Sequence, residues 1–210
     1  MIEVDPADFT KIVVGVDPSV TSGDDADTTG IVVVAAGPHQ PETCSIAHCD
    51  VHGYVLEDAS LPSSSKNSVD AWARRVVRAY DEWSANIVVV ESNQGHELLE
   101  SVLRTIRPMI PIERPNARYS KQARAEPIVA LYEQGRVHHL GDMDAFKDLE
   151  EEMCSWVPPA PGKRASKSPD RIDALVWALS ELNLQGKKIR RNDLGGIAPM
   201  NFEQSNPWSM

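Results

Sequence analysis

The sequence predicts an α/β fold in which helices flank a mixed β-sheet. Between residues 11 and 56, β-branched and apolar runs follow one another through polar connections, as in an antiparallel meander. Further along the chain, amphipathic helical patterns alternate with short apolar runs, which favours parallel strands joined by helices. The two patterns together predict a sheet that begins antiparallel and gains parallel strands later.

The strands of the meander are predicted from runs of Val, Ile and other apolar residues. The first run covers residues 11–17 and ends at Asp17. A second strand is expected over residues 30–36 and a third over residues 43–49, with a weaker apolar run at residues 54–56. Later strands are predicted at residues 87–91, 110–112 and 137–138.

Apolar residues at three- and four-residue steps predict the helices. Their expected ranges are 69–83, 98–106, 120–134, 146–156 and 170–184. In the third helix, Ser120 is expected to cap the start, and Gly135 is expected to end the helix. Pro127 lies in its interior, so a kink or a break into two pieces is expected there.

Length and composition favour one domain with a tail. The chain has 210 residues, of which 41% are apolar and 25% charged, as in a typical globular protein. Residues 1–185 are predicted to form the domain, and residues 186–210 a basic, flexible C-terminal tail. The sequence lacks both an apolar run of the roughly 20 residues needed to cross a bilayer and the pattern of a signal peptide. We therefore expect no membrane association and an intracellular location.

The three cysteines, Cys44, Cys49 and Cys154, are predicted to be free thiols. They show neither a Cys-x-x-Cys spacing nor histidine partners at the spacing typical of zinc sites. His138 and His139 lie beside a predicted strand and are considered as ligands or proton carriers. Acidic residues are the better ligands for hard divalent ions.

The charge balance bears on possible partners. Acidic residues outnumber basic ones 31 to 21, which gives a formal charge of −10. This argues against a protein that coats nucleic acid, because binding to phosphate normally uses a basic surface. It does not exclude an enzyme that acts on nucleic acid, since metal-binding acids raise the acidic count and bases can gather on one face.

Three acidic residues, far apart in the sequence, each lie at the end of an apolar element. Asp17 and Glu91 end β-branched runs, and Asp173 lies near the start of the last helical pattern. Ligands bind at the carboxyl ends of strands in open α/β sheets, and a buried acid is costly unless it is paired or binds a metal. We predict that these acids form a metal site, with Asp170, on the same helical face as Asp173, as an auxiliary ligand.

Carboxylate ligands indicate the kind of ion and reaction. Mg²⁺ and Mn²⁺ are hard cations that prefer oxygen ligands. Two such ions about 4 Å apart can stabilise the attacking and leaving oxygens of a phosphodiester. The three acids therefore favour two Mg²⁺ or Mn²⁺ ions and phosphodiester hydrolysis.

Several segments, taken in order, resemble the C-terminal nuclease domain of phage terminase large subunits. They are IVVGVDPS at residues 12–19, DTTGIVVV at 27–34, IVVVE at 87–91 and SPDRIDALVWAL at 168–179. The stretch YEQGRVHH at residues 132–139 and the helix after it are similar to the same family. The resemblance covers residues 10–184, and it rests on the order and spacing of the segments together.

The resemblance implies an RNase H-like fold and an endonuclease that cuts concatemeric viral DNA into genome lengths with two divalent metal ions. The family's acidic triad matches Asp17, Glu91 and Asp173, and Asp27 lies where family members often carry a further acid. The implied substrate is double-stranded DNA, and the implied location is the host cell cytoplasm.

The same resemblance implies partners. In full-length members of the family the nuclease follows an ATPase motor domain and works with a small terminase subunit and a portal. The P-loop pattern of such a motor is absent from this sequence, so we expect an isolated, monomeric nuclease domain without packaging activity of its own.

Basic residues are expected to flank the acidic site and hold the DNA backbone. They are Arg118, Lys121, Arg124, Lys163, Arg164 and Lys167. Because the net charge is negative, the domain alone is expected to bind DNA weakly and without sequence preference.

Other classes of protein fit parts of the pattern. Junction resolvases and transposases use the same scaffold with strand-end acids, but the closing helix and the long loop before it favour the terminase domain. An actin-like or sugar-kinase ATPase also ends its first strand in Asp, but it needs a second similar domain and glycine-rich nucleotide loops. A non-catalytic DNA- or partner-binding module, with structural carboxylates, is the third alternative.

Overall fold

The computed structural model describes residues 4–18, 29–46, 49–61, 68–91, 96–115, 119–142, 144–157 and 169–184. Its strands are β1 (Lys11–Asp17), β2 (Gly30–Pro38), β3 (Val51–Asp58), β4 (Ile87–Val90), β5 (Ile112–Glu113) and β6 (Val137–His139). Its helices are the 3₁₀ turn η1 (Pro6–Asp8), α1 (Val69–Glu82), α2 (His96–Ile106), α3 (Lys121–Glu133), α4 (Lys147–Ser155) and α5 (Asp170–Leu182).

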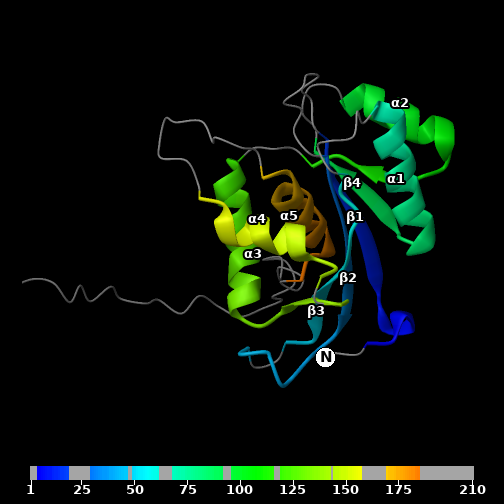
Figure 1. Cartoon of the computed structure of the whole chain (residues 1–210). Coiled ribbons are helices and arrows are strands. Elements are labelled where there is room, and N and C mark those ends of the chain that lie inside the picture. Colours follow the sequence, from blue (N-terminus) through cyan, green and yellow to red (C-terminus); the bar gives the residue numbers. More distant parts are fainter. Residues whose placement is uncertain are drawn as a thin grey trace, which may run out of the picture.

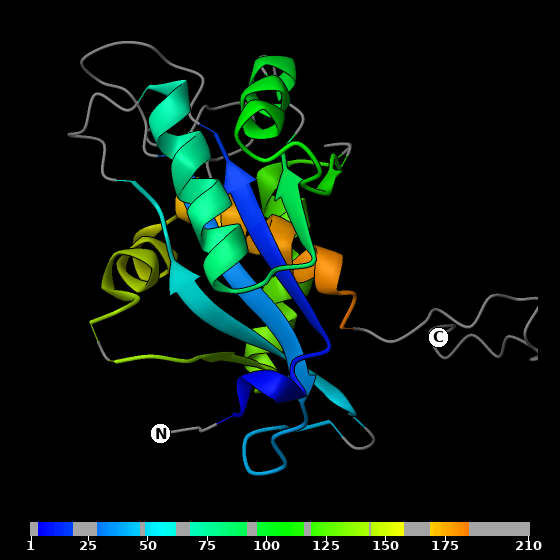
Figure 2. The same cartoon turned by 90° about the vertical axis from the view of Figure 1, so that its right-hand side faces the viewer.

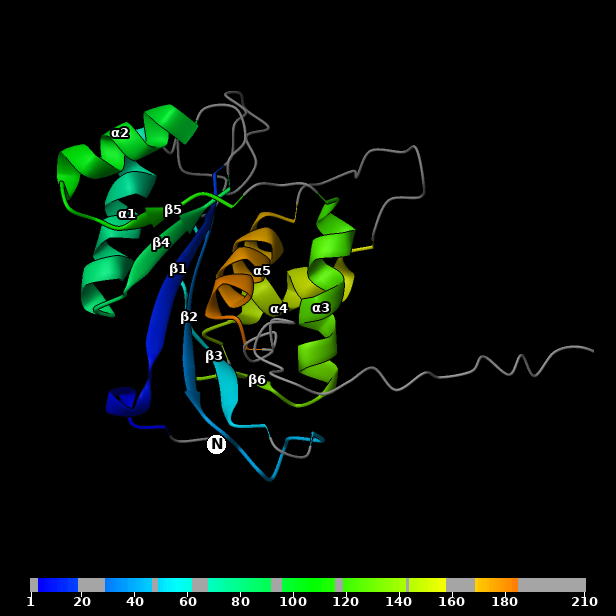
Figure 3. The same cartoon turned by 180° about the vertical axis from the view of Figure 1, so that it is seen from behind.

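The six strands form one mixed sheet in the order β5-β4-β1-β2-β3-β6 (Figure 3). β1, β2 and β3 are antiparallel neighbours. β4 is parallel to β1, β5 is parallel to β4, and β6 is parallel to β3. The predicted mixed sheet is therefore confirmed, with the antiparallel meander at its centre and the later parallel strands at its edges.

Helices cover both faces of the sheet. α1 and α2 lie on one face, and α3, α4 and α5 lie on the other (Figures 1 and 2). Side chains of β1 alternate between two apolar cores, because successive residues of a strand point to opposite faces. Val14 and Val16 pack with the residues of α1, whereas Val13 packs with those of α5.

α5 approaches the sheet closely because two strand residues lack a side chain. A Cβ atom on Gly15 would lie 2.2 Å from the carbonyl oxygen of Ala174, and one on Gly30 would lie 2.0 Å from that of Asp170. Any other residue at these positions would push the helix away from β1 and β2. The two glycines thus fix the distance between the start of α5 and the ends of the central strands.

The third strand was predicted wrongly. Residues 43–49 do not form a strand over their described part, and β3 instead covers Val51–Asp58, which includes the weaker run at residues 54–56. Residues 41–43 form a turn, and the backbone N–H of Ser45 donates to the carbonyl of Gln134 and not to a neighbouring strand. Ile46, the large apolar residue of this segment, is 40% exposed, so the segment lacks the burial that a strand of the sheet would provide.

Helix α3 continues through Pro127 without a break. The proline removes one backbone hydrogen bond, but Ala125, Ile128 and Leu131 are buried and hold the helix against the core. Both predicted ends are confirmed. The Ser120 hydroxyl accepts from the N–H of Ala123, and Gly135 adopts a left-handed φ of 66° after the C-cap.

The remaining predicted elements appear with small shifts at their ends. β5 begins at Ile112, because Pro111 has no N–H to donate to a neighbouring strand. None of the helices in the described ranges combines the length and the apolar character needed to cross a membrane. The predicted tail, residues 186–210, lies outside the described residues.

Candidate active site

Two acids meet where parallel strands end. Asp17 is the last residue of β1, and Glu91 directly follows β4, which is the parallel neighbour of β1. The N–H of Glu91 donates to the carbonyl of Val16 at 3.2 Å, so the strand pairing itself brings the two acids to adjacent positions. On the other side of β1, Asp17 is paired with Gly30, the residue against which α5 begins.

The first turn of α5 supplies two more acids to the same end of the sheet. Asp170 and Asp173 occupy this turn, three residues apart. All four carboxylate residues are buried, with exposed fractions of 5% for Asp17, 2% for Glu91, 4% for Asp170 and 2% for Asp173. A buried acid is rare in a folded protein, and a group of four requires compensating positive charge.

Two cationic side chains of α3 lie among these acids. The Lys121 ammonium contacts Asp173 Oδ2 and lies 3.5 Å from Asp17 Oδ2. Arg124 Nη2 lies 3.4 Å from Glu91 Oε1 and 3.7 Å from Asp173 Oδ1. Lys121 and Arg124 therefore link Asp17, Asp173 and Glu91 into one chain of alternating charges.

The two cations differ in freedom to move. The Arg124 side chain is only 9% exposed, and its guanidinium stacks over the Trp177 ring at 4.3 Å. The Lys121 side chain is 36% exposed, and its ammonium is carried by a flexible aliphatic stem. Arg124 is thus a fixed part of the site, whereas Lys121 can turn toward solvent.

The pKa values reflect burial first and the crowding of like charges second. Burial raises the pKa of Asp17 well above its ordinary range, and the neighbouring carboxylates of Glu91, Asp173 and Asp170 add to this against the opposing effect of Lys121. Burial likewise raises the pKa of Asp173. For Lys121, burial acts to lower the pKa, but the attraction of the acids is larger in sum and the pKa is raised. The site therefore favours additional positive charge.

The residues fit a hard divalent cation. Four carboxylates face two cationic side chains, which leaves an excess of negative charge, and carboxylate oxygens are the ligands that Mg²⁺ and Mn²⁺ prefer. Glu91 Oε2 is buried and accepts no hydrogen bond from the described residues. Because Lys121 lies between Asp17 and Asp173, it has to move for both acids to bind the same ion.

A family model of the terminase RNaseH-like domain matches residues 14–182. The chain belongs to this family. The matched region runs from β1 to the end of α5 and includes all four acids of the site. No curated protein matches the chain.

Solved structures share the fold of this terminase domain. The large terminase nuclease from thermophilic phage G20c has a TM-score of 0.52 at 15% identity, covering 81% of this chain and 82% of that chain. A structure of the same nuclease with bound magnesium has a TM-score of 0.51 at 15% identity, with 81% of each chain covered. The Mn-soaked, inhibitor-bound terminase nuclease domain of human cytomegalovirus has a TM-score of 0.51 at 14% identity, covering 83% of this chain and 84% of that chain. These likenesses confirm the predicted fold.

The predicted site residues of the terminase domain fall into two groups. The structure brings together Asp17, Glu91, Asp170, Asp173, Lys121 and Arg124. Four basic candidates and one acid lie outside the described residues: Arg118, Lys163, Arg164, Lys167 and Asp27. Lys121 and Arg124, predicted to flank the acidic site and hold DNA, lie directly against the acids, whereas their contact with DNA stays a prediction.

The histidines of β6 lie away from the acids. His138 Nε2 is 2.7 Å from Nδ1 of His52, and His139 is hydrogen-bonded to Tyr132 and Glu150. Sequence reasoning also missed a group formed by His39, Cys44, Cys49 and His52. Cys44, Cys49 and Cys154 are free thiols, as predicted, but His39 and His52 lie beside Cys44 and Cys49 in the fold. The spacing of the four residues resembles no common zinc motif, so only the folded chain reveals the group.

Proposed function

We propose that this chain is a divalent-metal-dependent endonuclease of a viral genome-packaging terminase and cuts concatemeric double-stranded DNA. The observation that carries the proposal is the meeting of four buried carboxylates at the ends of β1, β4 and α5. The magnesium-bound and Mn-soaked structures of the two related nucleases support a metal requirement.

Asp17, Glu91 and Asp173 are the proposed ligands for two Mg²⁺ or Mn²⁺ ions, with Asp170 as an auxiliary ligand. When bound, such a pair of ions would stabilise the attacking and leaving oxygens of the phosphodiester. The strand ends and the first turn of α5 hold the carboxylates in position before DNA arrives, which avoids the cost of ordering them during the reaction. Asp27, which lies outside the described residues, is proposed as a further acid.

Lys121 and Arg124 are proposed to contact the DNA phosphate at the site. Arg124 is held by Glu91 and Trp177, so its planar guanidinium presents a fixed donor group. Lys121 is proposed to turn from the acids to a phosphate oxygen once divalent ions balance the carboxylates. Arg118, Lys163, Arg164 and Lys167 are proposed to hold the backbone on either side.

The wider assignment follows from the family. The domain is proposed to act in the host cell cytoplasm beside an ATPase motor domain, a small terminase subunit and a portal. The net charge of −10 is unfavourable for DNA binding by the domain alone. The partners are therefore proposed to supply most of the affinity for DNA.

Conversion of supercoiled plasmid to nicked and linear forms tests the proposal. Wild-type protein is expected to cut in Mg²⁺ or Mn²⁺ and not in EDTA, and Asp173→Ala is expected to be inactive. Glu151→Gln, an exposed acid on α4, is the matched control and should cut like the wild type. A wild-type protein that is folded but inert with both ions would contradict the proposal and favour a non-catalytic binding module.

Neutralising Lys163, Arg164 and Lys167 together is expected to weaken DNA binding across all sequences. Each lost phosphate contact lowers the dependence of log K on log salt by about 0.9. Binding of an EDTA-treated protein to a labelled duplex at several salt concentrations measures that slope. The control is Arg74→Ala with Arg78→Ala on the exposed face of α1. An unchanged slope in the triple variant would remove these residues from the DNA-binding surface.

A further inference from the structure

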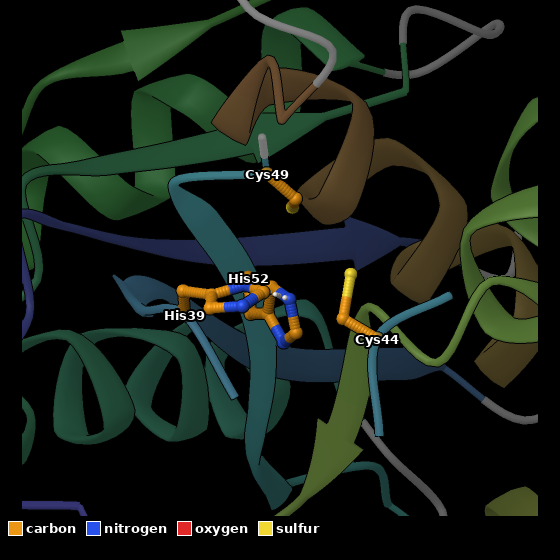
Figure 4. Close-up of side chains that lie close together, drawn as sticks. All are labelled: His39, Cys44, Cys49 and His52. Carbon is orange, nitrogen blue, oxygen red and sulfur yellow. Dashed lines mark hydrogen bonds between the residues drawn. The ribbon is translucent and has the colours of Figure 1, made fainter. Parts of the chain in front are cut away.

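A second group of metal-ligating side chains lies at the far end of β2. His39 directly follows β2, Cys44 lies in the connection to β3, Cys49 precedes β3, and His52 is on β3 (Figure 4). One ligand atom from each residue can be chosen so that all four lie within 4.8 Å of one another. Within the described residues, no other set of three or more His, Cys, Asp or Glu side chains has its ligand atoms this close together.

The distances are close to those of a tetrahedral zinc site. His39 Nδ1 and His52 Nε2 are 3.2 Å apart. Two nitrogens bound tetrahedrally to one zinc at about 2.05 Å are about 3.3 Å apart, and two sulfurs at about 2.3 Å are about 3.8 Å apart. Closing the group around an ion therefore requires movements of about 1 Å or less.

His52 is oriented by a neighbour outside the group. Its Nδ1 lies 2.7 Å from Nε2 of His138 on β6, and both residues are buried. This contact turns Nε2 of His52 toward His39 and the cysteines, and metal-binding histidines characteristically use their second nitrogen in this way. Burial, with the charges of His138, His39 and Arg136, lowers the pKa of His52 to about 4, so the ring is neutral near pH 7 and able to bind a metal.

Cys44 is held in place by contacts with the turn between α3 and β6. The N–H of Ser45 donates to the carbonyl of Gln134 at 3.0 Å, and the Thr43 hydroxyl donates to that of Gly135 at 3.2 Å. A Cβ atom on Gly135 would lie 2.0 Å from the Thr43 carbonyl oxygen, so the glycine is needed for this approach. The fold therefore builds the site from a docked loop and a strand.

The two thiols can supply the negative charge that a bound cation needs. Burial raises the pKa of Cys49, and the nearby Arg136 acts against this. A bound divalent ion would stabilise the thiolates, because metal binding displaces thiol protons. Two thiolates then balance the charge of the ion.

We infer that His39, Cys44, Cys49 and His52 bind a structural zinc ion. Sulfur and imidazole ligands favour zinc over Mg²⁺ and Mn²⁺, and four protein ligands close the site to substrate. The acids lie at the opposite end of β2, about 25 to 30 Å away along the strand. The zinc would fasten the connection between β2 and β3 and is distinct from the nuclease ions.

The test measures metal in tag-free, reduced, full-length protein. About one zinc per chain is expected by elemental analysis, and it should be lost in Cys44→Ser and Cys49→Ser. Cys154→Ser is the matched control, because Cys154 is an exposed thiol outside the group, and it should retain zinc. His39→Ala should also lose zinc. Because His39 is partly exposed, this change disturbs the core less than a change at the buried Cys49.

Cobalt substitution gives a readout independent of stability. Wild-type protein loaded with Co²⁺ should show the visible bands of tetrahedral cobalt and thiolate-to-cobalt charge transfer, which oxygen ligands at the acidic site do not produce. A folded, reduced wild-type protein without zinc and without this spectrum would overturn the inference. A Cys44–Cys49 disulfide in freshly purified protein would overturn it as well.

Discussion

Asp17→Asn is expected to abolish plasmid cutting and at the same time to make the protein more stable. Loss of one metal ligand removes stabilisation of about 4 kcal/mol from the transition state, on the order of 10³-fold in rate. The same change removes one of four crowded carboxylates and leaves three acids for two cations, so neither Lys121 nor Arg124 is left without an acidic partner. In EDTA the melting temperature should rise by about 3 °C.

The stability gain should depend on pH. The folded-state pKa of Asp17 is raised, so the folded protein holds this proton more tightly than the unfolded chain. The resulting contribution to stability is full below the unfolded pKa of about 3.9 and is lost as pH rises through the raised value. The wild type is therefore penalised most at neutral and alkaline pH, and the variant escapes this penalty.

Melting temperatures of both proteins at about pH 5 and about pH 8 in EDTA measure the difference. The advantage of Asp17→Asn should be larger at the higher pH, and added Mn²⁺ should stabilise the wild type more than the variant. Glu151→Gln controls for the loss of one negative charge far from the site. Full activity in Asp17→Asn, or equal stabilisation of both proteins by Mn²⁺, would contradict the assignment of Asp17 as a ligand.

Gly30→Ala is expected to have the largest effect on folding. The added Cβ would lie 2.0 Å from the oxygen and 2.4 Å from the carbon of the Asp170 carbonyl, both of them backbone atoms at the start of α5. The helix has to shift by about 1 Å, and overpacking of this kind costs about 3 kcal/mol. Since the shifted turn carries Asp170 and Asp173, cutting should fall about 10²-fold even where the protein is folded.

Urea unfolding measures the stability change, and plasmid cutting well below the melting temperature measures the activity change. The control is Gly141→Ala, whose Cβ would meet the side chains of Phe146 and Ala145 at 3.1 and 3.2 Å. The Phe146 ring can turn and the Ala145 contact needs a shift of only a few tenths of an ångström, so this variant should lose less than about 1 kcal/mol. Equal losses in the two glycine variants would show that close approach of α5 is not what Gly30 provides.

The acidic site could be predicted from the sequence because its acids lie at the ends of predicted strands and at the start of a predicted helix. A β-branched run that stops at Asp17 or Glu91 indicates both a strand and the edge at which it ends. Helical spacing then places Asp173 among apolar residues, where an acid needs a partner. These signals are local, and the parallel pairing of β1 and β4 turns them into one site.

Other features could not be derived from local pattern. The strand expected at residues 43–49 has strand-like composition, but the backbone N–H of Ser45 and the hydroxyls of Thr43 and Ser45 donate to the turn after α3, about ninety residues further along the chain. The group around Cys44 and His52 depends on that same contact. Lys121 and Arg124 are expected near the acids from the sequence, but their direct ion pairs with Asp173 and Glu91 depend on the packing of α3 on α5.

The packing of α5 against β1 has a consequence during synthesis. β1 is made early, whereas α5 is the last helix of the described chain, and the acidic site needs both. A nascent chain that has completed β1 and β4 but not α5 holds Asp17 and Glu91 without Asp173. Because the ligands come from such distant segments, the site assembles only after nearly the whole domain has left the ribosome. A translation product that ends before α5 therefore lacks Asp173, one of the proposed metal ligands.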